Sequence, residues 1–203
     1  GIAIGSPSTA TSDNNSSIAS YSQQILYKTA NEQSWKISNV FDNNNTPDDF
    51  SIVFNDIYMY DENYAIIIGN NTTATLNNPY AFATNDGGVT WYRILIHVPF
   101  DQRIFKKVSI NQISNNYRII IQYSTFDNNS FGVYYFDTPT LENLFTSANT
   151  INYIINITEI TDNNGGIHTN SISVINEQNI MVGNGISVFN TDSLTFNNPV
   201  NTN

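Results

Sequence analysis

The fold of this chain is decided by one stretch of sequence, Thr84-Asn85-Asp86-Gly87-Gly88-Val89-Thr90-Trp91. Asp86 is placed to accept hydrogen bonds from the backbone N–H groups of its own turn. Gly87 and Gly88 permit the positive φ angles that a tight turn needs. Thr90 starts a new strand, and Trp91 is large enough to wedge between two packed sheets. The stretch therefore predicts a hydrogen-bonded turn between two strands, closed by a buried indole.

Strand-like segments flank this turn on both sides. Residues 50–60 alternate between apolar and polar side chains, and 64–69 form a short apolar run. A third segment, 79–84, leads into the turn and a fourth, 90–98, leaves it. No helical period interrupts them. Four short strands joined by turns predict an antiparallel meander.

The same order of strands and turns recurs along the chain. The predicted units are 1–41, 50–98, 105–146 and 167–198. Their closing apolar residues follow one another at nearly equal spacings: Trp35, Trp91, Leu144 and Phe196. Four-stranded repeats of about 40–55 residues are typical of propeller blades, whose faces bury against neighbouring blades.

The pattern S/T-x-D-x-G-x-T-W in residues 84–91 resembles the Asp-box, or bacterial neuraminidase repeat. That repeat occurs in sialidases, sortilin-type receptors and photosystem-assembly propellers. The resemblance implies a structural role at the outer edge of a blade for Thr84, Asp86, Gly88, Thr90 and Trp91. Degenerate boxes are predicted in the other units, at Asn31, Trp35, Asp137, Leu144, Asp192 and Phe196.

These patterns predict an all-β chain, 1–203, that is a single β-propeller-like array of about four four-stranded antiparallel blades. The first unit lacks an innermost strand, because residues 1–5 match the second strand of later units. The polar tail 197–203, which contains Pro199, is a poor substitute for that strand. We therefore expect further sequence or a neighbouring subunit to complete a larger propeller or assembly, so that the isolated chain associates in light-scattering measurements.

Sialidase is the enzyme that the motif suggests, and its family grips the substrate carboxylate with three arginines. This chain has three in all, Arg93, Arg103 and Arg118, and Arg93 follows the box on an outer strand. We therefore predict no catalytic residue in this chain and no enzymatic activity. The alternative is a portion of a sialidase-like glycoside hydrolase whose catalytic residues lie outside this segment.

No metal site or cofactor is predicted. His97 and His168 lie in different repeats, and the chain has no cysteine. Transition-metal sites are usually built from several such side chains. The loop 42–49 offers oxygen ligands for Ca²⁺ but lacks the glycine and distal glutamate of an EF-hand loop.

Charge and hydropathy exclude two classes of partner. The chain has 7 basic and 17 acidic residues, for a formal net charge of −10. Nucleic-acid binding depends on Lys and Arg neutralising phosphates, so no nucleic-acid partner is predicted. A membrane-spanning helix needs about 20 apolar residues, and no run in the sequence approaches that length.

Asparagine is abundant and often paired, which an AT-rich genome using Asn as a turn residue would explain. Glycosylation is the other interpretation. The predicted acceptors in Asn-x-Ser/Thr triplets are Asn15, Asn44, Asn70, Asn71, Asn128 and Asn156.

The remaining prediction is a non-enzymatic component of a cell-surface, secreted or virion assembly. Its propeller would act as a scaffold, or as a platform that binds protein subunits or surface glycans. The candidate tyrosines for stacking on such partners are Tyr58, Tyr60, Tyr134 and Tyr135, and core packing is expected for half of them.

Overall fold

The computed structural model describes residues 1–5, 24–41, 52–71, 79–94, 96–97, 103–125, 131–146, 155–156, 158–161, 172–176, 179–182, 187–190, 193 and 195–197. Within these ranges the chain is built of strands with one short helix. The all-β prediction is confirmed. No helix in the described ranges is long and apolar enough to cross a membrane.

Most of the strands belong to four sheets, which we number in chain order. Sheet 1 has the order β1 (Ile2–Ile4), β2 (Ile25–Tyr27), β3 (Lys36–Ile37). Sheet 2 has the order β4 (Asn39–Phe41), β8 (Thr90–Ile94), β7 (Pro79–Thr84), β6 (Ala65–Asn71), β5 (Ile52–Met59).

Sheets 3 and 4 are four-stranded antiparallel meanders, as predicted for each unit. Sheet 3 consists of β10 (Arg103–Ile113), β11 (Asn116–Thr125), β12 (Phe131–Thr138) and β14 (Thr158–Thr161). Sheet 4 consists of β15 (Ile172–Asn176), β16 (Asn179–Val182), β17 (Ser187–Asn190) and β18 (Thr195–Asn197). A short parallel pair joins β9 (Ile96–His97) to β13 (Ile155–Asn156).

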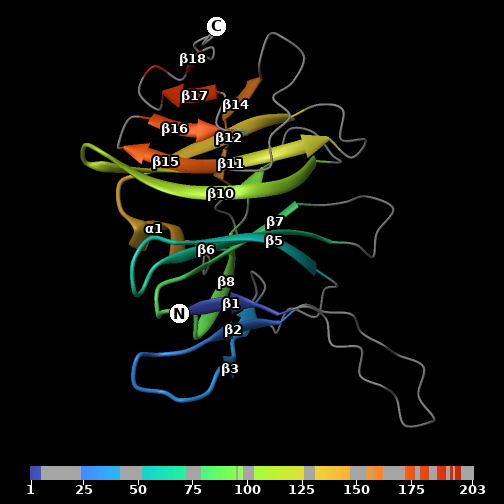
Figure 1. The fold of residues 1–203 in the computed structure, drawn as a ribbon, viewed down its shortest axis with the longest axis vertical. Helices are drawn as coiled ribbons and strands as arrows, with labels where there is room; N and C mark the ends of the chain where they lie inside the picture. Colours follow the sequence, from blue (N-terminus) through green and yellow to red (C-terminus); the bar gives the residue numbers. More distant parts are fainter. Residues whose placement is uncertain are drawn as a thin grey trace, which may run out of the picture.

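Sheet 2 lies above sheet 1 along the long axis of the molecule, and sheets 3 and 4 occupy the upper part of the view, where they overlap (Figure 1). Sheet 1 is at the bottom of the view and sheet 4 at the top, so these two sheets lie at opposite ends. Strand β10 contacts strands of sheet 2 on one side and β15 of sheet 4 on the other. Sheets 2 and 3 are therefore the inner layers of the stack.

Sheet 2 is buried on both faces around β6, an inner strand that begins with four apolar residues. In β6, Ala65, Ile66, Ile67 and Ile68 are each at most 1% exposed. Successive side chains of a strand point to opposite faces. Ile66 and Ile68 pack into a core shared with sheet 3, whereas Ala65 and Ile67 pack into a core shared with sheet 1.

Two bulges tie sheet 2 to sheet 3. The register of β5 shifts between Phe54 and Asp56, and that of β10 shifts between Phe105 and Lys107. Asn55 Nδ2 donates to the Phe105 carbonyl oxygen at 2.6 Å. Asp56 accepts from the Val108 N–H at 2.9 Å and pairs with Lys107 Nζ at 3.2 Å. The bulges thus turn polar side chains of β5 towards the backbone of β10.

The first two units depart from the predicted four-stranded pattern. Sheet 1 has three strands, and β4, from the end of the predicted unit 1–41, joins sheet 2 parallel to β8. Two hydrogen bonds join this segment to the box turn. Ser38 Oγ donates to the Gly88 carbonyl oxygen at 2.5 Å, and the Asn39 N–H donates to the Val89 carbonyl oxygen at 2.9 Å.

The third unit contains a helix where the sequence predicted a degenerate box. Helix α1 (Leu141–Thr146) begins after Thr140, whose Oγ1 accepts the Asn143 N–H at 3.2 Å as an N-cap. Leu141 and Leu144 lie on one face of the helix and are buried in the core shared by sheets 2 and 3. The fourth strand of this sheet is therefore β14, which lies beyond the predicted boundary at residue 146.

Candidate functional site

The predicted Asp-box forms the turn between β7 and β8, and Thr84 is its centre. Thr84 Oγ1 accepts the N–H of Gly88 at 3.0 Å and that of Asp86 at 3.3 Å. It donates to Asp86 Oδ1 at 2.7 Å, and the same oxygen accepts the Thr90 N–H at 2.9 Å. Asp86 therefore accepts hydrogen bonds from its own turn, as the sequence predicted, but the buried hydroxyl of Thr84 makes more of them.

Both box glycines adopt the left-handed backbone that the sequence predicted. The φ angle is 73° at Gly87 and 91° at Gly88. A Cβ atom at Gly88 would also lie 2.9 Å from the side chain of Ile2 in sheet 1. Gly88 is therefore required twice, for its φ angle and for the close approach of sheet 1.

Trp91 closes the turn as predicted. The indole is fully buried, and its Nε1 donates to the Gly88 carbonyl oxygen at 3.1 Å. The ring packs with Ile25 and Phe82, which belong to sheets 1 and 2. Trp91 therefore wedges between neighbouring sheets, which is the structural role that the resemblance implied.

Thr84→Val is expected to lower the free energy of unfolding by about 1–3 kcal/mol, because the buried Gly88 N–H loses its acceptor. Valine keeps the shape of threonine, so the change isolates the hydroxyl. Thr84→Ser retains the hydroxyl and is the control. Urea denaturation measures both variants, and equal losses for valine and serine would contradict this role of the hydroxyl.

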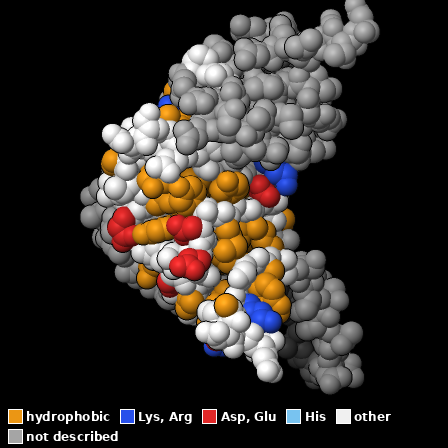
Figure 2. All heavy atoms as spheres, turned by 60° about the vertical axis from the view of Figure 1, so that its left-hand side comes forward, with side chains coloured by type: hydrophobic (Ala, Val, Ile, Leu, Met, Phe, Trp, Pro, Cys, Tyr) orange, Lys and Arg blue, Asp and Glu red, His pale blue; other side chains and the backbone are white. Residues whose placement is uncertain are grey.

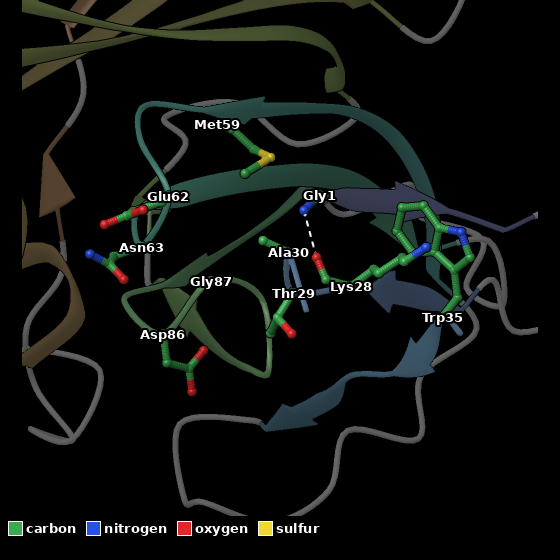
Figure 3. Close-up of a pocket in the computed structure, with 10 residues that line it drawn as sticks. All are labelled: Gly1, Lys28, Thr29, Ala30, Trp35, Met59, Glu62, Asn63, Asp86 and Gly87. Atoms are coloured by element: carbon green, nitrogen blue, oxygen red, sulfur yellow. Dashed lines mark hydrogen bonds between the residues drawn. The ribbon is translucent and has the colours of Figure 1, made fainter. Parts of the chain in front are cut away.

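A cleft of about 570 Å³ opens beside the box turn. One wall comes from sheet 1, with Gly1, the turn 28–30 and Trp35. The other comes from sheet 2, with Met59, Glu62 and Asn63 at the end of β5 and Asp86 and Gly87 in the box (Figure 3). In Figure 3, Trp35 lies at one end of the cleft, and Glu62, Asn63 and Asp86 lie towards the other.

The cleft combines an exposed aromatic ring with acidic groups. Trp35 is 48% exposed and Met59 is 38% exposed, which is unusual for large apolar side chains. Glu62 and Asp86 are exposed carboxylates. Oδ1 of Asp86 is used by the turn, and its Oδ2 makes no hydrogen bond to the described residues. A concave surface with apolar walls and a few polar groups is typical of a ligand site.

The sheet 1 wall is held by backbone and side-chain hydrogen bonds. Gly1 and Lys28 exchange two of them, from Gly1 N to the Lys28 carbonyl at 2.7 Å and from Lys28 N to the Gly1 carbonyl at 2.8 Å. The Thr29 N–H donates to Glu32 Oε2 at 3.3 Å, and Lys36 forms an ion pair with Glu32. Trp35 is thus carried by an ordered turn.

The opposite wall is held by the turn between β5 and β6. Asp61 Oδ1 accepts the N–H groups of Asn63 and Tyr64, each at 2.8 Å. The Asn63 carbonyl in turn accepts the Gly87 N–H at 3.0 Å. The box turn and the β5–β6 turn therefore form one hydrogen-bonded unit, which fixes Glu62 and Asp86 on the same side of the cleft.

The degenerate box of the first unit does not repeat the geometry of the Asp-box. Trp35 precedes β3 and is exposed, whereas Trp91 lies within β8 and is buried. Asn31 is exposed in the turn after β2. This segment has no glycine to supply a positive φ angle, so it forms a wider turn that leaves the indole in the cleft.

The third and fourth units differ in how far they keep the box. Asp137 lies within β12 and forms a bidentate ion pair with Arg118 of β11, both contacts at 2.7 Å, so it does not cap a turn. Leu144 lies on α1. In the fourth unit, Asn190 Oδ1 accepts the Ser193 N–H at 2.7 Å, and Phe196 is the second residue of β18, as Trp91 is of β8. Asp192 lies outside the described residues.

The three arginines stack on three different tyrosines. The guanidinium carbon of Arg93 lies 4.1 Å from the centroid of the Tyr80 ring. The guanidinium carbon of Arg103 lies 5.0 Å from the centroid of the Tyr123 ring. For Arg118 the corresponding distance to the centroid of the Tyr135 ring is 4.7 Å. The three arginines are carried by β8, β10 and β11.

Two of the residues predicted at the surface are buried. Tyr134 is fully buried and stacks on Tyr123 at 4.3 Å, so it is unavailable for a partner. Asn70 is 4% exposed, accepts from Asn55 Nδ2 at 2.8 Å and donates to the Arg103 carbonyl at 3.0 Å. This packing leaves no room for a glycan on Asn70.

The side chains of the other predicted glycan acceptors are outside the described part of the structure. Asn15, Asn44 and Asn128 lie outside the described residues. Asn71 and Asn156 lie in strands, but their side chains are not described. The described residues include no group of three or more His, Cys, Asp or Glu side chains that could hold a metal ion.

The pKa of Tyr64, which follows the turn between β5 and β6, is raised. Tyr64 Oη donates to Glu142 Oε2 at 2.7 Å, and this hydrogen bond raises the pKa of Tyr64. The neutral phenol is favoured because its phenolate would face the carboxylate. Burial raises the pKa of Tyr58 in the same direction.

Stability is expected to fall above pH 10 in part through Tyr64. Its folded-state pKa exceeds the unfolded value of about 10, so the unfolded chain loses this proton first. The contribution is fully present below the unfolded pKa and is lost as the pH rises through the folded one. Urea midpoints should therefore fall less steeply above pH 10 in Tyr64→Phe than in the wild type. Equal slopes would contradict the shift.

No protein-family model matches the sequence, and no curated protein matches it. The fold is similar to a solved structure of α-L-arabinanase from Penicillium chrysogenum in complex with arabinobiose, with a TM-score of 0.43 and 14% sequence identity. The match covers 86% of this chain and 52% of that one, so the chain spans about half the length of that structure. At this identity no residue can be matched to a role in that enzyme.

Proposed function

We propose that this chain is a non-enzymatic carbohydrate-binding module and that the cleft beside the box turn is its binding site. The observation that carries the proposal is Trp35, which is 48% exposed at a cleft lined by Glu62 and Asp86. The C–H face of a sugar stacks on an aromatic ring, whose face carries negative potential. Its hydroxyls donate to carboxylate oxygens, and an ionised carboxylate acts only as an acceptor.

Trp35→Ala is expected to weaken glycan binding at least tenfold, which corresponds to about 1.4 kcal/mol. Ile37→Ser is the matched control, because Ile37 is 61% exposed two residues further on and does not line the cleft. Isothermal titration with neutral oligosaccharides found on a glycan array measures both. Unchanged binding in Trp35→Ala, or an equal loss in Ile37→Ser, would overturn the assignment of the site.

Glycoside hydrolysis at the same cleft is the second candidate, because Glu62 and Asp86 are two exposed carboxylates on one side of it. Glycosidases use a pair of carboxylates as acid and as base or nucleophile. Release of reducing sugar from the bound oligosaccharide would favour this function, provided that Glu62→Gln abolishes the release. Binding without any release favours the binding module.

We also propose that the four sheets are blades of an Asp-box propeller within a cell-surface, secreted or virion assembly. The meander topology of sheets 3 and 4 and the box between the third and fourth strands of a meander support this. Sheets 1 and 4 lie at opposite ends of the stack, so a ring would need further blades (Figure 1). Light scattering tests the proposed assembly. Association of the chain is expected, and a monomeric closed ring would contradict the proposal.

A further inference from the structure

We propose that Tyr60, Tyr64 and Tyr117 extend the cleft into a longer site for a linear, neutral oligosaccharide. We call these three side chains the tyrosine platform. The inference rests on the proposed function, because it lengthens the same site. It assigns a ligand of several sugar units in place of a single sugar.

One short turn joins the cleft to the tyrosine platform. The Tyr60 N–H donates to the Tyr64 carbonyl at 2.9 Å, and Asp61 Oδ1 accepts two further N–H groups inside the turn. Glu62 and Asn63, at the tip, line the cleft. The turn therefore presents polar groups to the cleft and carries a tyrosine at each end.

The rings of the platform are held in place by contacts at their edges. Tyr60 and Tyr117 meet edge to face, with centroids 5.4 Å apart and planes at 88°. Tyr60 Oη donates to Gln112 Oε1 at 3.2 Å, and Tyr64 Oη donates to Glu142 Oε2 at 2.7 Å. All three tyrosines are half-buried, because they pack against the core shared by sheets 2 and 3 and remain partly exposed. Rings that are already fixed lose little conformational entropy when a ligand stacks on them.

The platform and the cleft lie on one edge of the molecule. Asn85 of the box turn donates to Glu142 Oε1 at 3.5 Å, which links the cleft wall to the helix beside Tyr64. Figure 2 turns the left side of Figure 1 forward and shows hydrophobic side chains gathered across this edge, with acidic side chains among them. Apolar surface interrupted by acceptors suits a sugar chain, whose rings alternate C–H faces with hydroxyl donors.

The negative charge around the site favours a neutral ligand over an acidic one. Four carboxylates surround the site: Asp61, Glu62, Asp86 and Glu142. Lys28 is the cationic side chain that lines the cleft, and the chain carries a net charge of −10. Uronic acids and sialic acids would be repelled by this field. Neutral oligosaccharides carry no such penalty.

The length of the ligand provides the test on the unaltered protein. Titration calorimetry with cello-, manno- and xylo-oligosaccharides, from the disaccharide to the hexasaccharide, is expected to show affinity rising about tenfold or more with length for the series that binds. Oligosaccharides of uronic acids should bind more weakly than neutral ones of equal length. Tighter binding of the acidic series would overturn the inference.

Variants separate the two parts of the site. Tyr117→Ala is expected to remove the gain in affinity with length, whereas Trp35→Ala weakens binding of every oligosaccharide, the disaccharide included. Tyr117→Phe keeps the ring and should behave as wild type, and Val53→Ser, on an exposed part of β5 outside the site, is the surface control. Binding that does not depend on length overturns only the platform. Absence of binding to every oligosaccharide overturns the proposed function as well.

Discussion

Trp91→Ala is expected to lower the free energy of unfolding by about 3–5 kcal/mol, as large-to-small substitutions of buried aromatic residues do. The indole is 0% exposed, packs between sheets 1 and 2 and donates to the Gly88 carbonyl. Alanine would leave a cavity and remove this hydrogen bond together. Urea denaturation followed by circular dichroism measures the loss.

The other tryptophan of the chain is the matched control. Trp35 is 48% exposed, so Trp35→Ala is expected to change the free energy of unfolding by less than about 0.5 kcal/mol. The pair separates the structural role of Trp91 from the ligand-binding role proposed for Trp35. A Trp91→Ala variant that kept its stability but lost glycan binding would show that the box is functional and not structural.

The strands could be predicted from the sequence because their signals are local. The apolar run at 65–68 and the turn 84–91 each determine their own geometry through burial and hydrogen bonding, and both formed as predicted. Strand β14 and helix α1 were missed, because a degenerate box was expected at 137–144. Thr140 and two leucines spaced for a helix face were the signal that favoured α1.

The candidate site could not be predicted from the sequence. Trp35 was predicted only as the closing residue of a degenerate box, in a place of the repeat equivalent to that of Trp91. The exposure of Trp35 depends on the path of the turn from β2 to β3, where no glycine provides the tight geometry of the box. The cleft itself arises from three turns far apart in sequence, 28–35, 60–64 and the box turn with Asp86 and Gly87. Such long-range pairing leaves no local pattern to read.

Sheet 2 shows why the two cores of this molecule depend on one another. Alternate residues of β6 face opposite cores, so each core is built against the same strand. A cavity on one face removes support from the strand that the other face needs. Disruption of either core is therefore expected to destabilise sheets 1 to 3 together.

Phe105→Ala tests this dependence from the side of sheet 3 and is expected to cost about 3–5 kcal/mol. The ring is fully buried and meets Tyr134 edge to face at 6.3 Å, and the Phe105 carbonyl accepts the side chain of Asn55. Phe105→Leu keeps most of the volume and should cost less than about 1.5 kcal/mol.

The number of steps in the urea unfolding of Phe105→Ala shows whether the two cores unfold together. If sheets 1 to 3 share their stability through β6, the Phe105→Ala variant unfolds in a single step, and the exposed Trp35 and the buried Trp91 report the same urea midpoint. Single-tryptophan versions of the variant, with Trp35→Phe or Trp91→Phe, separate the two fluorescence signals. Because Trp91 lies in the opposite core, an early transition confined to circular dichroism, with Trp91 still protected, would show that the two cores unfold independently.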